Sequence, residues 1–294
     1  MTVVIACVQY QPEVLPDWAA YGAKLERLVR HAASAGARLV VFPEYAGMEI
    51  ANLLSAADRQ DVARSVEAAQ GMLRDVLALH ADMARRHGVT IVAGSLPVRV
   101  DGDLRNRAHV FSPSGTVMSQ DKLTITRGER ERLGLSGGDA VTVFRAAWGT
   151  FAVALGYDIE FPPVARVMVE AGAEIILVPS YSTTVADFQR VRACARARAV
   201  ENQSYVAHAP LVGALPWSSL PGTGTAAVFS PCDTGFPSDG ILARATSEQL
   251  QLVVARLDFA LIERVRAEGE VRNLLRQREI EAKPAPRVET VGLG

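Results

Sequence analysis

The sequence contains few cysteines, and they lie far apart. Only Cys7, Cys194 and Cys232 occur among its 294 residues, and no CxxC pair is present. An odd number of widely spaced cysteines argues against a disulfide framework and against a zinc site. We therefore expect a protein of the reducing cytoplasm, without disulfides or a structural metal.

An excess of one charge and long apolar stretches are also missing. The 31 basic and 32 acidic residues give a net charge of −1, unlike the basic surface of a nucleic-acid binder. Apolar runs such as 175–179 are far shorter than the ~20 residues of a membrane span. The first residues lack the basic region and apolar segment of a signal peptide. Nucleic acids and membranes are therefore not expected partners.

Short apolar or β-branched runs alternate with longer stretches of helical periodicity. The predicted strands include 2–9, 38–42, 89–95, 151–155, 174–178 and 204–209, and the predicted helices include 21–36, 57–87, 163–171, 185–202 and 259–268. Strands outside simple βαβ repetition predict an α/β fold with a mixed sheet, or two sheets layered with helices. No linker divides the chain, so we expect one domain over 1–268 and a polar extension over 269–294.

Three segments place chemically active positions directly after predicted strands, where α/β enzymes assemble their sites. Glu44 follows an apolar strand and a proline, and poor solvation there would raise the pKa of its carboxyl group and suit a general base. Lys122 is one of only three lysines, and Glu129 follows it seven positions later. A fixed ammonium can stabilise a developing oxyanion. Gly156 lies at a sharp turn between a predicted strand and a predicted helix.

Each of these segments also has a purely structural interpretation. Glu44 could cap the next segment, the charged stretch 121–130 could be solvated, and Gly156 could be an ordinary turn glycine. A different hydrolase is disfavoured, because there is no GxSxG elbow and the five histidines show no HExxH or clustered metal spacing.

In their order and separations, the segments resemble the nitrilase superfamily of carbon–nitrogen hydrolases over nearly the whole chain. The strings that carry the resemblance are FPE (42–44), TRGER (126–130), YDIEFP (157–162) and RARAVENQ (196–203). The resemblance implies a four-layer α-β-β-α sandwich that forms a homodimer or higher homo-oligomer. It also implies a small-molecule amide, carbamoyl or nitrile substrate and no cofactor or metal.

The resemblance implies a role for each matched residue. In that family a cysteine attacks the substrate carbon, a glutamate is the general base and acid, a lysine binds the oxyanion, and a second glutamate supports the lysine. The corresponding residues are Glu44, Lys122 and Glu129, with Glu131 as the alternative second glutamate. Gly156 occupies the place of the nucleophile. The residues expected to bind substrate are Tyr157, Asp158, Ser180 and Tyr181.

Glycine at position 156 is the departure that decides activity. None of the three cysteines lies where it could replace the nucleophile. We therefore expect a hydrolase scaffold that binds substrate, with added room at Gly156, but that has no detectable turnover as written. The alternative is a natural pseudoenzyme that binds an amide or a protein partner. The pair Tyr157 and Asp158 is more similar to amidase and carbamoylase members than to nitrilases, which favours an amide or N-carbamoyl substrate over a nitrile.

These interpretations predict specific contacts. The ammonium of Lys122 should lie between Glu44 and Glu129, near Gly156, because two close carboxylates require a cation. The late helix, with Arg198 and Glu201, should brace the pocket or form the core of a subunit contact. The extension 269–294 should pack on a partner subunit, since Leu274 and Leu275 have no evident place in this chain.

Overall fold

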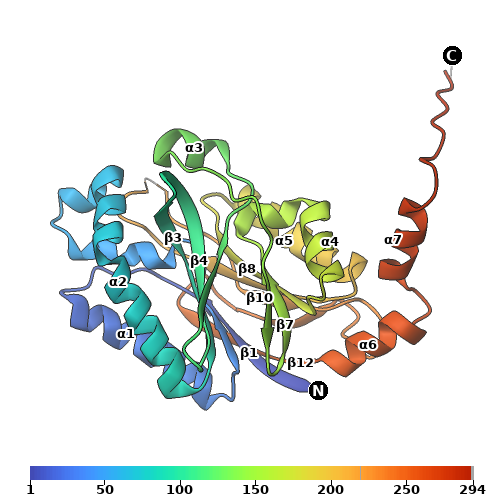
Figure 1. Cartoon of the computed structure of the whole chain (residues 1–294), viewed down its shortest axis with the longest axis horizontal. Helices are drawn as coiled ribbons and strands as arrows, with labels where there is room; N and C mark the ends of the chain where they lie inside the picture. The colour runs from blue at the N-terminus through green and yellow to red at the C-terminus, as the bar shows by residue number, and fades with distance from the viewer. Residues whose placement is uncertain (219, 293–294) are drawn as a thin grey trace.

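Two six-stranded sheets packed against each other form the body of the protein. The computed structural model describes residues 1–218 and 220–292 (Figure 1). The first sheet has the order β12-β1-β2-β3-β4-β5, made of β12 (Gln251–Asp258), β1 (Thr2–Gln9), β2 (Leu39–Val41), β3 (Thr90–Val100), β4 (Asp103–Phe111) and β5 (Val117–Asp121). The second has the order β11-β10-β9-β8-β7-β6, made of β11 (Ile241–Arg244), β10 (Ala227–Phe229), β9 (Tyr205–Leu211), β8 (Ile175–Tyr181), β7 (Gly149–Val153) and β6 (Val143–Ala146).

Each sheet has three neighbouring parallel strands, β1-β2-β3 in the first and β7-β8-β9 in the second, and its other pairs are antiparallel. The helices are α1 (Trp18–Ser34), α2 (Val62–His87), α3 (Arg127–Leu133), α4 (Pro162–Glu170), α5 (Val185–Glu201), α6 (Phe259–Glu268) and α7 (Asn273–Glu281), with 3₁₀ helices η1 (Ala46–Leu53), η2 (Asp58–Gln60) and η3 (Gly156–Glu160).

The alternation of apolar side chains along β1 shows how the layers form. Ile5 and Cys7 face the second sheet and join the core between the two sheets. Ala6 and Val8 face the other way and pack with the residues of α1 and α2. A strand with both faces apolar needs a layer on each side. Helices α4 and α5 cover the outer face of the second sheet in the same manner. The four-layer α-β-β-α sandwich is therefore confirmed.

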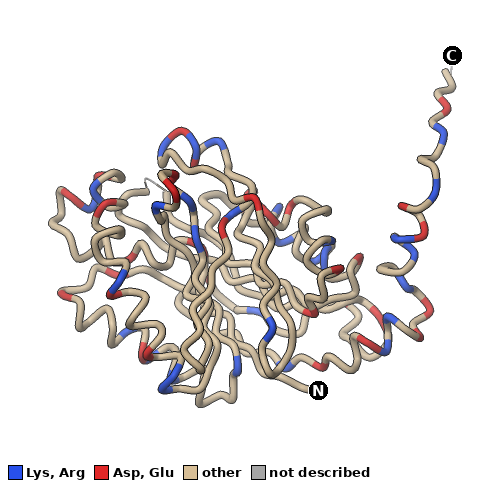
Figure 2. Tube along the Cα trace, viewed as in Figure 1, with Lys and Arg blue, Asp and Glu red and all other residues tan. Residues whose placement is uncertain are grey.

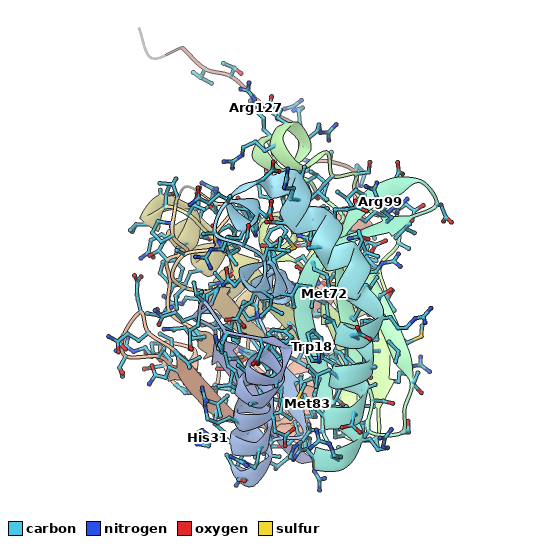
Figure 3. The ribbon with its side chains drawn as sticks, turned by 90° about the vertical axis from the view of Figure 1, so that its left-hand side faces the viewer. Trp18, His31, Met72, Met83, Arg99 and Arg127 are labelled. Atoms are coloured by element: carbon cyan, nitrogen blue, oxygen red, sulfur yellow. The ribbon has the colours of Figure 1, made fainter. Side chains whose placement is uncertain are left out.

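The outer helices begin and end at residues suited to those positions. The Asp17 side chain accepts a hydrogen bond from the backbone of Ala20 and caps α1, and Asp61 caps α2. Gly88 ends α2 in the left-handed conformation. Figure 3 shows α1 and α2 side by side, with Trp18 and Met83 among the residues that pack in this layer.

The charged residues of both signs are interspersed along the chain (Figure 2). None of the helices in the described part of the chain is long and apolar enough to cross a lipid bilayer.

Two predictions about the chain outside the sheets were wrong. Residues 127–133 form the helix α3, which was not among the predicted helices. Leu274, on α7, packs against the core around α4 and α5, so it does have a place in this chain. Leu275 remains 39% exposed, and residues 282–292 extend away from the sandwich (Figure 1).

Candidate active site

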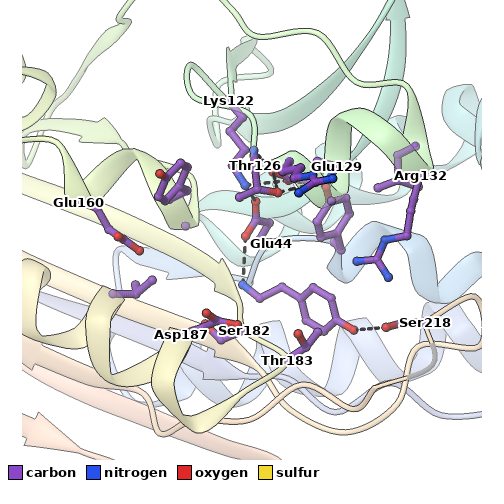
Figure 4. A pocket seen from close by; sticks show the side chains of 18 of the residues that line it. Glu44, Lys122, Thr126, Glu129, Arg132, Glu160, Ser182, Thr183, Asp187 and Ser218 are labelled. Atoms are coloured by element: carbon purple, nitrogen blue, oxygen red, sulfur yellow. Dashed lines mark hydrogen bonds and ion pairs between the residues drawn. The ribbon is translucent and has the colours of Figure 1, made fainter.

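A cavity of about 420 Å³ lies at one end of the sandwich, where segments from both sheets meet. Glu44 follows β2, Lys122 follows β5, Gly156 follows β7 and begins η3, and Tyr181 ends β8. The strands β2, β7 and β8 belong to the parallel parts of their sheets, so loops at their carboxyl ends converge. Figure 4 shows Glu44, Lys122 and Glu129 grouped at this cavity.

Lys122 lies between two carboxylates. Its Nζ is 2.8 Å from Glu44 Oε1 and 2.7 Å from Glu129 Oε1. The side chain is only 3% exposed, and the Asn106 side chain donates a further hydrogen bond to Glu44 Oε1 at 2.9 Å. The predicted geometry of the lysine is thus confirmed. A buried cation held by two buried anions fixes all three groups, because each would be costly without the others.

The three charged groups differ in how firmly they hold their protons. Burial raises the pKa of Glu44 to about 7, although the charge of Lys122 acts in the opposite direction. Burial also acts to raise the pKa of Glu129, but Lys122 and the surrounding hydrogen bonds hold it below its usual value. Burial disfavours the ammonium of Lys122, yet the two carboxylates raise its pKa. Glu44 is therefore the member of the cluster that titrates near neutral pH, as a general base requires.

The second glutamate of the cluster is Glu129, not Glu131. Thr126 caps α3, and its backbone N–H donates to Glu129 Oε2 at 2.9 Å while its Oγ1 accepts from the Glu129 backbone at 3.2 Å. This capping box aims the carboxylate at Lys122, and the phenol of Tyr45 donates to Glu129 Oε1 at 2.6 Å. Glu131 instead points outward and pairs with Arg127.

Gly156 has a backbone conformation that other residues rarely adopt, with φ = +43°. A Cβ atom built on it would lie 2.5 Å from Glu44 Oε2. That carboxylate oxygen is held in place by the backbone N–H of Tyr181 at 3.0 Å. The sharp turn expected at Gly156, here called the elbow, is present, but the expectation of added room is wrong, because the end of Glu44 fills the space.

Two polar residues fix the backbone around the Gly156 elbow through hydrogen bonds. The Arg198 guanidinium donates to the carbonyl oxygens of Ile159 and Glu160, each at 3.0 Å, and so braces η3. The carboxylate of Asp158 accepts from the backbone N–H groups of Leu123 at 3.1 Å and Thr124 at 2.7 Å. Asp158 therefore ties the elbow to the loop that follows Lys122.

The structure corrects two of the predicted substrate-binding residues. Tyr157 and Tyr181 line the cavity, whereas Asp158 and Ser180 do not. Ser180 is buried with its Oγ 2.7 Å from His208 Nε2. This serine–histidine pair is not an alternative nucleophile, because it does not reach the cavity and His208 Nδ1 has no partner among the described residues.

None of the three cysteines lines the cavity. Cys7 is fully buried between the sheets, and burial raises the pKa of its thiol to about 12. Cys194 lies on α5 and Cys232 is exposed. Within residues 1–218 and 220–292, no His, Cys, Asp and Glu side chains are grouped so as to hold a metal ion.

Several cavity residues were not anticipated from the sequence. Tyr45, Arg132, Trp217 and Ser218 all line the cavity. Tyr45 had an available signal in its position next to Glu44, and Arg132 had one in its position three residues after Glu129 on α3. Trp217 and Ser218 lie on the segment after β9, where no sequence pattern pointed to the site.

A protein-family model described as carbon-nitrogen hydrolase matches residues 4–267. The "Probable hydrolase YhcX" of Bacillus subtilis (strain 168) is 34% identical over 279 residues, which cover 94% of this chain and 54% of that protein. The chain thus spans about half the length of that relative. An omega-amidase of Xenopus laevis is 26% identical over 193 residues, covering 62% of this chain and 66% of that protein.

Solved structures share the fold. The carbon-nitrogen hydrolase from Helicobacter pylori G27 aligns with a TM-score of 0.76 at 20% identity and covers 96% of each chain. A variant of the amidase from Nesterenkonia sp. AN1, which carries acrylamide added at its active-site cysteine, aligns with a TM-score of 0.66 at 22% identity and covers 94% of this chain and 99% of the amidase chain.

Proposed function

The chain belongs to the carbon–nitrogen hydrolase family, and from that premise we propose that its cavity binds a small amide or N-carbamoyl compound in an amidase-type site that lacks its covalent nucleophile. The observation that carries the proposal is the buried Lys122 held between Glu44 and Glu129, directly beside the Gly156 elbow. The amidases among the relatives and structural neighbours support an amide over a nitrile.

Each charged group then has a defined task. The carbonyl oxygen of the ligand would face Lys122, whose ammonium stabilises negative charge on that oxygen. Glu129 keeps the lysine charged and oriented. Glu44, with its pKa raised to about 7 by burial, can accept or return one proton near neutral pH.

What Gly156 removes is the bond-forming step. In the cysteine form, a thiolate would attack the amide carbon, ammonia or an amine would leave with a proton from Glu44, and water would then hydrolyse the thioester. Glycine offers no atom for that attack. When the nucleophile of a comparable acyl-transfer site is removed, only about 10³–10⁴-fold acceleration over water remains. We therefore expect ligand binding without detectable turnover.

The test is paired kinetics of the native chain, Gly156→Cys and Gly156→Ser on a panel of amides, N-carbamoyl compounds and nitriles. The cysteine variant should hydrolyse at least one amide or N-carbamoyl compound, and the serine variant should be much slower. The new Cβ has to displace Glu44 Oε2 and the new residue has to adopt φ = +43°, so circular dichroism should show that each variant is folded before the kinetics are compared. Equal turnover by the native chain and the cysteine variant would contradict the assignment of position 156.

A natural binding protein is the second candidate, and one observation favours it. The Glu44 carboxylate occupies the space that a cysteine side chain would need, so this site is complementary to glycine. A well-folded Gly156→Cys variant that remains inactive on the whole panel, while the native chain binds amides more tightly than the variant does, would support this candidate over the first.

We also propose that the protein is a homodimer or higher homo-oligomer that associates through the outer face of α4 and α5. Val167 on α4 and Val185 on α5 are exposed apolar side chains on that layer. Sedimentation at micromolar concentration should give at least twice the monomer mass, and a clean monomer would contradict the proposal.

A further inference from the structure

Asn106 is a buried amide that contacts both carboxylates of the charged cluster. It lies on β4, is fully buried and does not line the cavity. Its Nδ2 donates to Glu44 Oε1 at 2.9 Å and lies 3.5 Å from Glu129 Oε1. Its backbone carbonyl accepts from the Lys122 N–H at 2.8 Å. Asn106 therefore meets the cluster through its backbone as well as through its side chain.

The carboxylate of Glu129 has no free position for a proton. Its Oε1 accepts from Lys122 Nζ at 2.7 Å and from the Tyr45 phenol at 2.6 Å. Its Oε2 accepts from the backbone N–H of Thr126 at 2.9 Å and from the hydroxyl of the same residue at 2.8 Å. An ionised carboxylate has about four acceptor positions, two on each oxygen. Because Glu129 uses all of them, the proton that the cluster takes up near neutral pH goes to Glu44.

The two oxygens of Glu44 differ in the number of donors that they meet. Oε1 accepts from Lys122 Nζ at 2.8 Å and from Asn106 Nδ2 at 2.9 Å, so both of its acceptor positions are used. Oε2 accepts from a single donor in the described part of the chain, the Tyr181 N–H at 3.0 Å. This oxygen also faces Gly156, where a built Cβ would be 2.5 Å away. A free acceptor position therefore remains on the oxygen beside the elbow.

We propose that Asn106 is a positioning residue that directs the proton of Glu44 onto Oε2, the oxygen beside Gly156. The inference rests on the proposed role of Glu44 as the group that accepts and returns a proton. By using the second acceptor position of Oε1, the amide leaves Oε2 as the place for the proton. In the cysteine form, the thiol proton would pass to Oε2 as the sulfur attacks, and the same oxygen would return it to the leaving nitrogen.

The other ionisable groups that face Glu44 keep their charges near neutral pH. Despite burial, the opposite charges beside them raise the pKa of Lys122 and lower the pKa of Glu129, so both groups stay ionised. Burial raises the pKa of the phenols of Tyr45 and Tyr181, so both stay neutral. A change in the titration of Glu44 therefore reports on the neutral groups that bind its carboxylate.

Infrared spectroscopy of the ligand-free native chain tests the inference without requiring turnover. A protonated carboxyl group gives a C=O band, which moves to higher wavenumber when the carbonyl oxygen loses a hydrogen bond. With the proton on Oε2, the carbonyl oxygen is Oε1, which has two donors. Subtracting the spectrum of Glu44→Gln separates the Glu44 band from those of other buried carboxyl groups, such as Asp158, whose pKa burial raises to about 6.

Asn106→Leu should move the Glu44 band to higher wavenumber, because Oε1 loses one of its two donors. It should also raise the titration midpoint of Glu44 by about 1–2 pH units, because the charged form loses a hydrogen bond. Asn106→Ala removes the same donor without adding an apolar branch and should give the same two shifts if the leucine variant does not fold. An unshifted band in a folded variant would overturn the inference.

Asn202→Leu is the matched control. Asn202 is also fully buried, its Nδ2 donates to the Arg198 carbonyl oxygen at 3.0 Å, and it lies after α5, away from the cavity lining. In both asparagines Oδ1 has no partner among the described residues. The control should lower stability but leave the band and the midpoint of Glu44 unchanged. Equal shifts in Asn106→Leu and Asn202→Leu would show a general loosening of the fold and overturn the role of Asn106.

The proposed function and this inference fail in different ways. If Gly156→Cys hydrolyses an amide but the Glu44 band does not respond to Asn106→Leu, the site stands and the role of Asn106 is wrong. If the band responds but Gly156→Cys is inactive on the whole panel, the proton is placed as proposed and the amidase-type function fails.

Discussion

Gly156→Ala is the change that probes the contact between the elbow and Glu44. Two costs follow from the structure. An alanine at φ = +43° costs about 1–2 kcal/mol in backbone energy. Its Cβ would also displace Glu44 Oε2 from the Tyr181 N–H, and loss of a hydrogen bond to a charged group costs about 1.5–3 kcal/mol. The free energy of unfolding should therefore fall by about 2.5–5 kcal/mol.

The second cost should vanish when Glu44 is already absent. In a Glu44→Ala background no carboxylate lies above Gly156, and Lys122 keeps one partner in Glu129. There, Gly156→Ala should cost only the backbone part, about 1–2 kcal/mol. The double-mutant cycle should thus give a coupling of about 1.5–3 kcal/mol between positions 44 and 156.

Urea unfolding of the four proteins, followed by circular dichroism, measures these values, and equal m-values are the check that the unfolded states are comparable. Additive costs, within about 0.5 kcal/mol, would refute the contact between Glu44 and Gly156. A negligible cost in both backgrounds would refute the left-handed backbone as well.

Three further predictions concern the buried polar groups. Because burial raises the pKa of Glu44 from 4.5 to about 7, the stabilising contribution of this group is complete below pH 4.5 and is lost as the pH rises to about 7. The free energy of unfolding of Glu44→Gln, measured against pH, should therefore decline less between pH 4.5 and about 7 than that of the native chain. Lys122→Met should lower the free energy of unfolding by about 3–5 kcal/mol, because two buried carboxylates lose their cation. Lys283→Met, on the exposed tail, should change the free energy of unfolding by less than about 0.5 kcal/mol, and similar losses in the two variants would contradict the buried cluster. Ser180→Ala should leave ligand binding unchanged but cost about 1–3 kcal/mol in a thermal or urea melt, since His208 Nε2 loses its partner, and an altered affinity would return Ser180 to the site.

The sequence predicted β1 and α6 with the bounds that the structure has, because their apolar patterns are regular. It did not predict α3, since a short helix with one buried residue has almost no apolar periodicity. The available signal was the capping box, a threonine at 126 followed three residues later by Glu129. That pattern marks a helix start even where the helix is polar.

The candidate site was predicted in part, for an equally physical reason. The grouping of Glu44, Lys122 and Glu129 was predicted from the resemblance to the nitrilase superfamily, and the need of two close carboxylates for a cation then placed Lys122 between them. The face to which the Ser180 side chain points could not be predicted, because it depends on whether β8 extends through residue 180. The predicted strand ends at residue 178, whereas β8 continues to Tyr181, and successive side chains of a strand point to opposite faces. Tyr181 therefore faces the cavity and Ser180 faces away.

The pairing of β1 with β12 has a consequence for how the protein is made. Gln9 lies opposite Gln251, and the ladder continues to Thr2 opposite Asp258. A ribosome that adds roughly 5–20 residues per second needs on the order of 10–50 s to make the chain between these partners. During that time β1 has one edge unpaired, and its apolar faces lack part of their cover. The nascent chain thus exposes its first strand until residues 251–258 have been made, so conditions that slow translation should increase its dependence on chaperones.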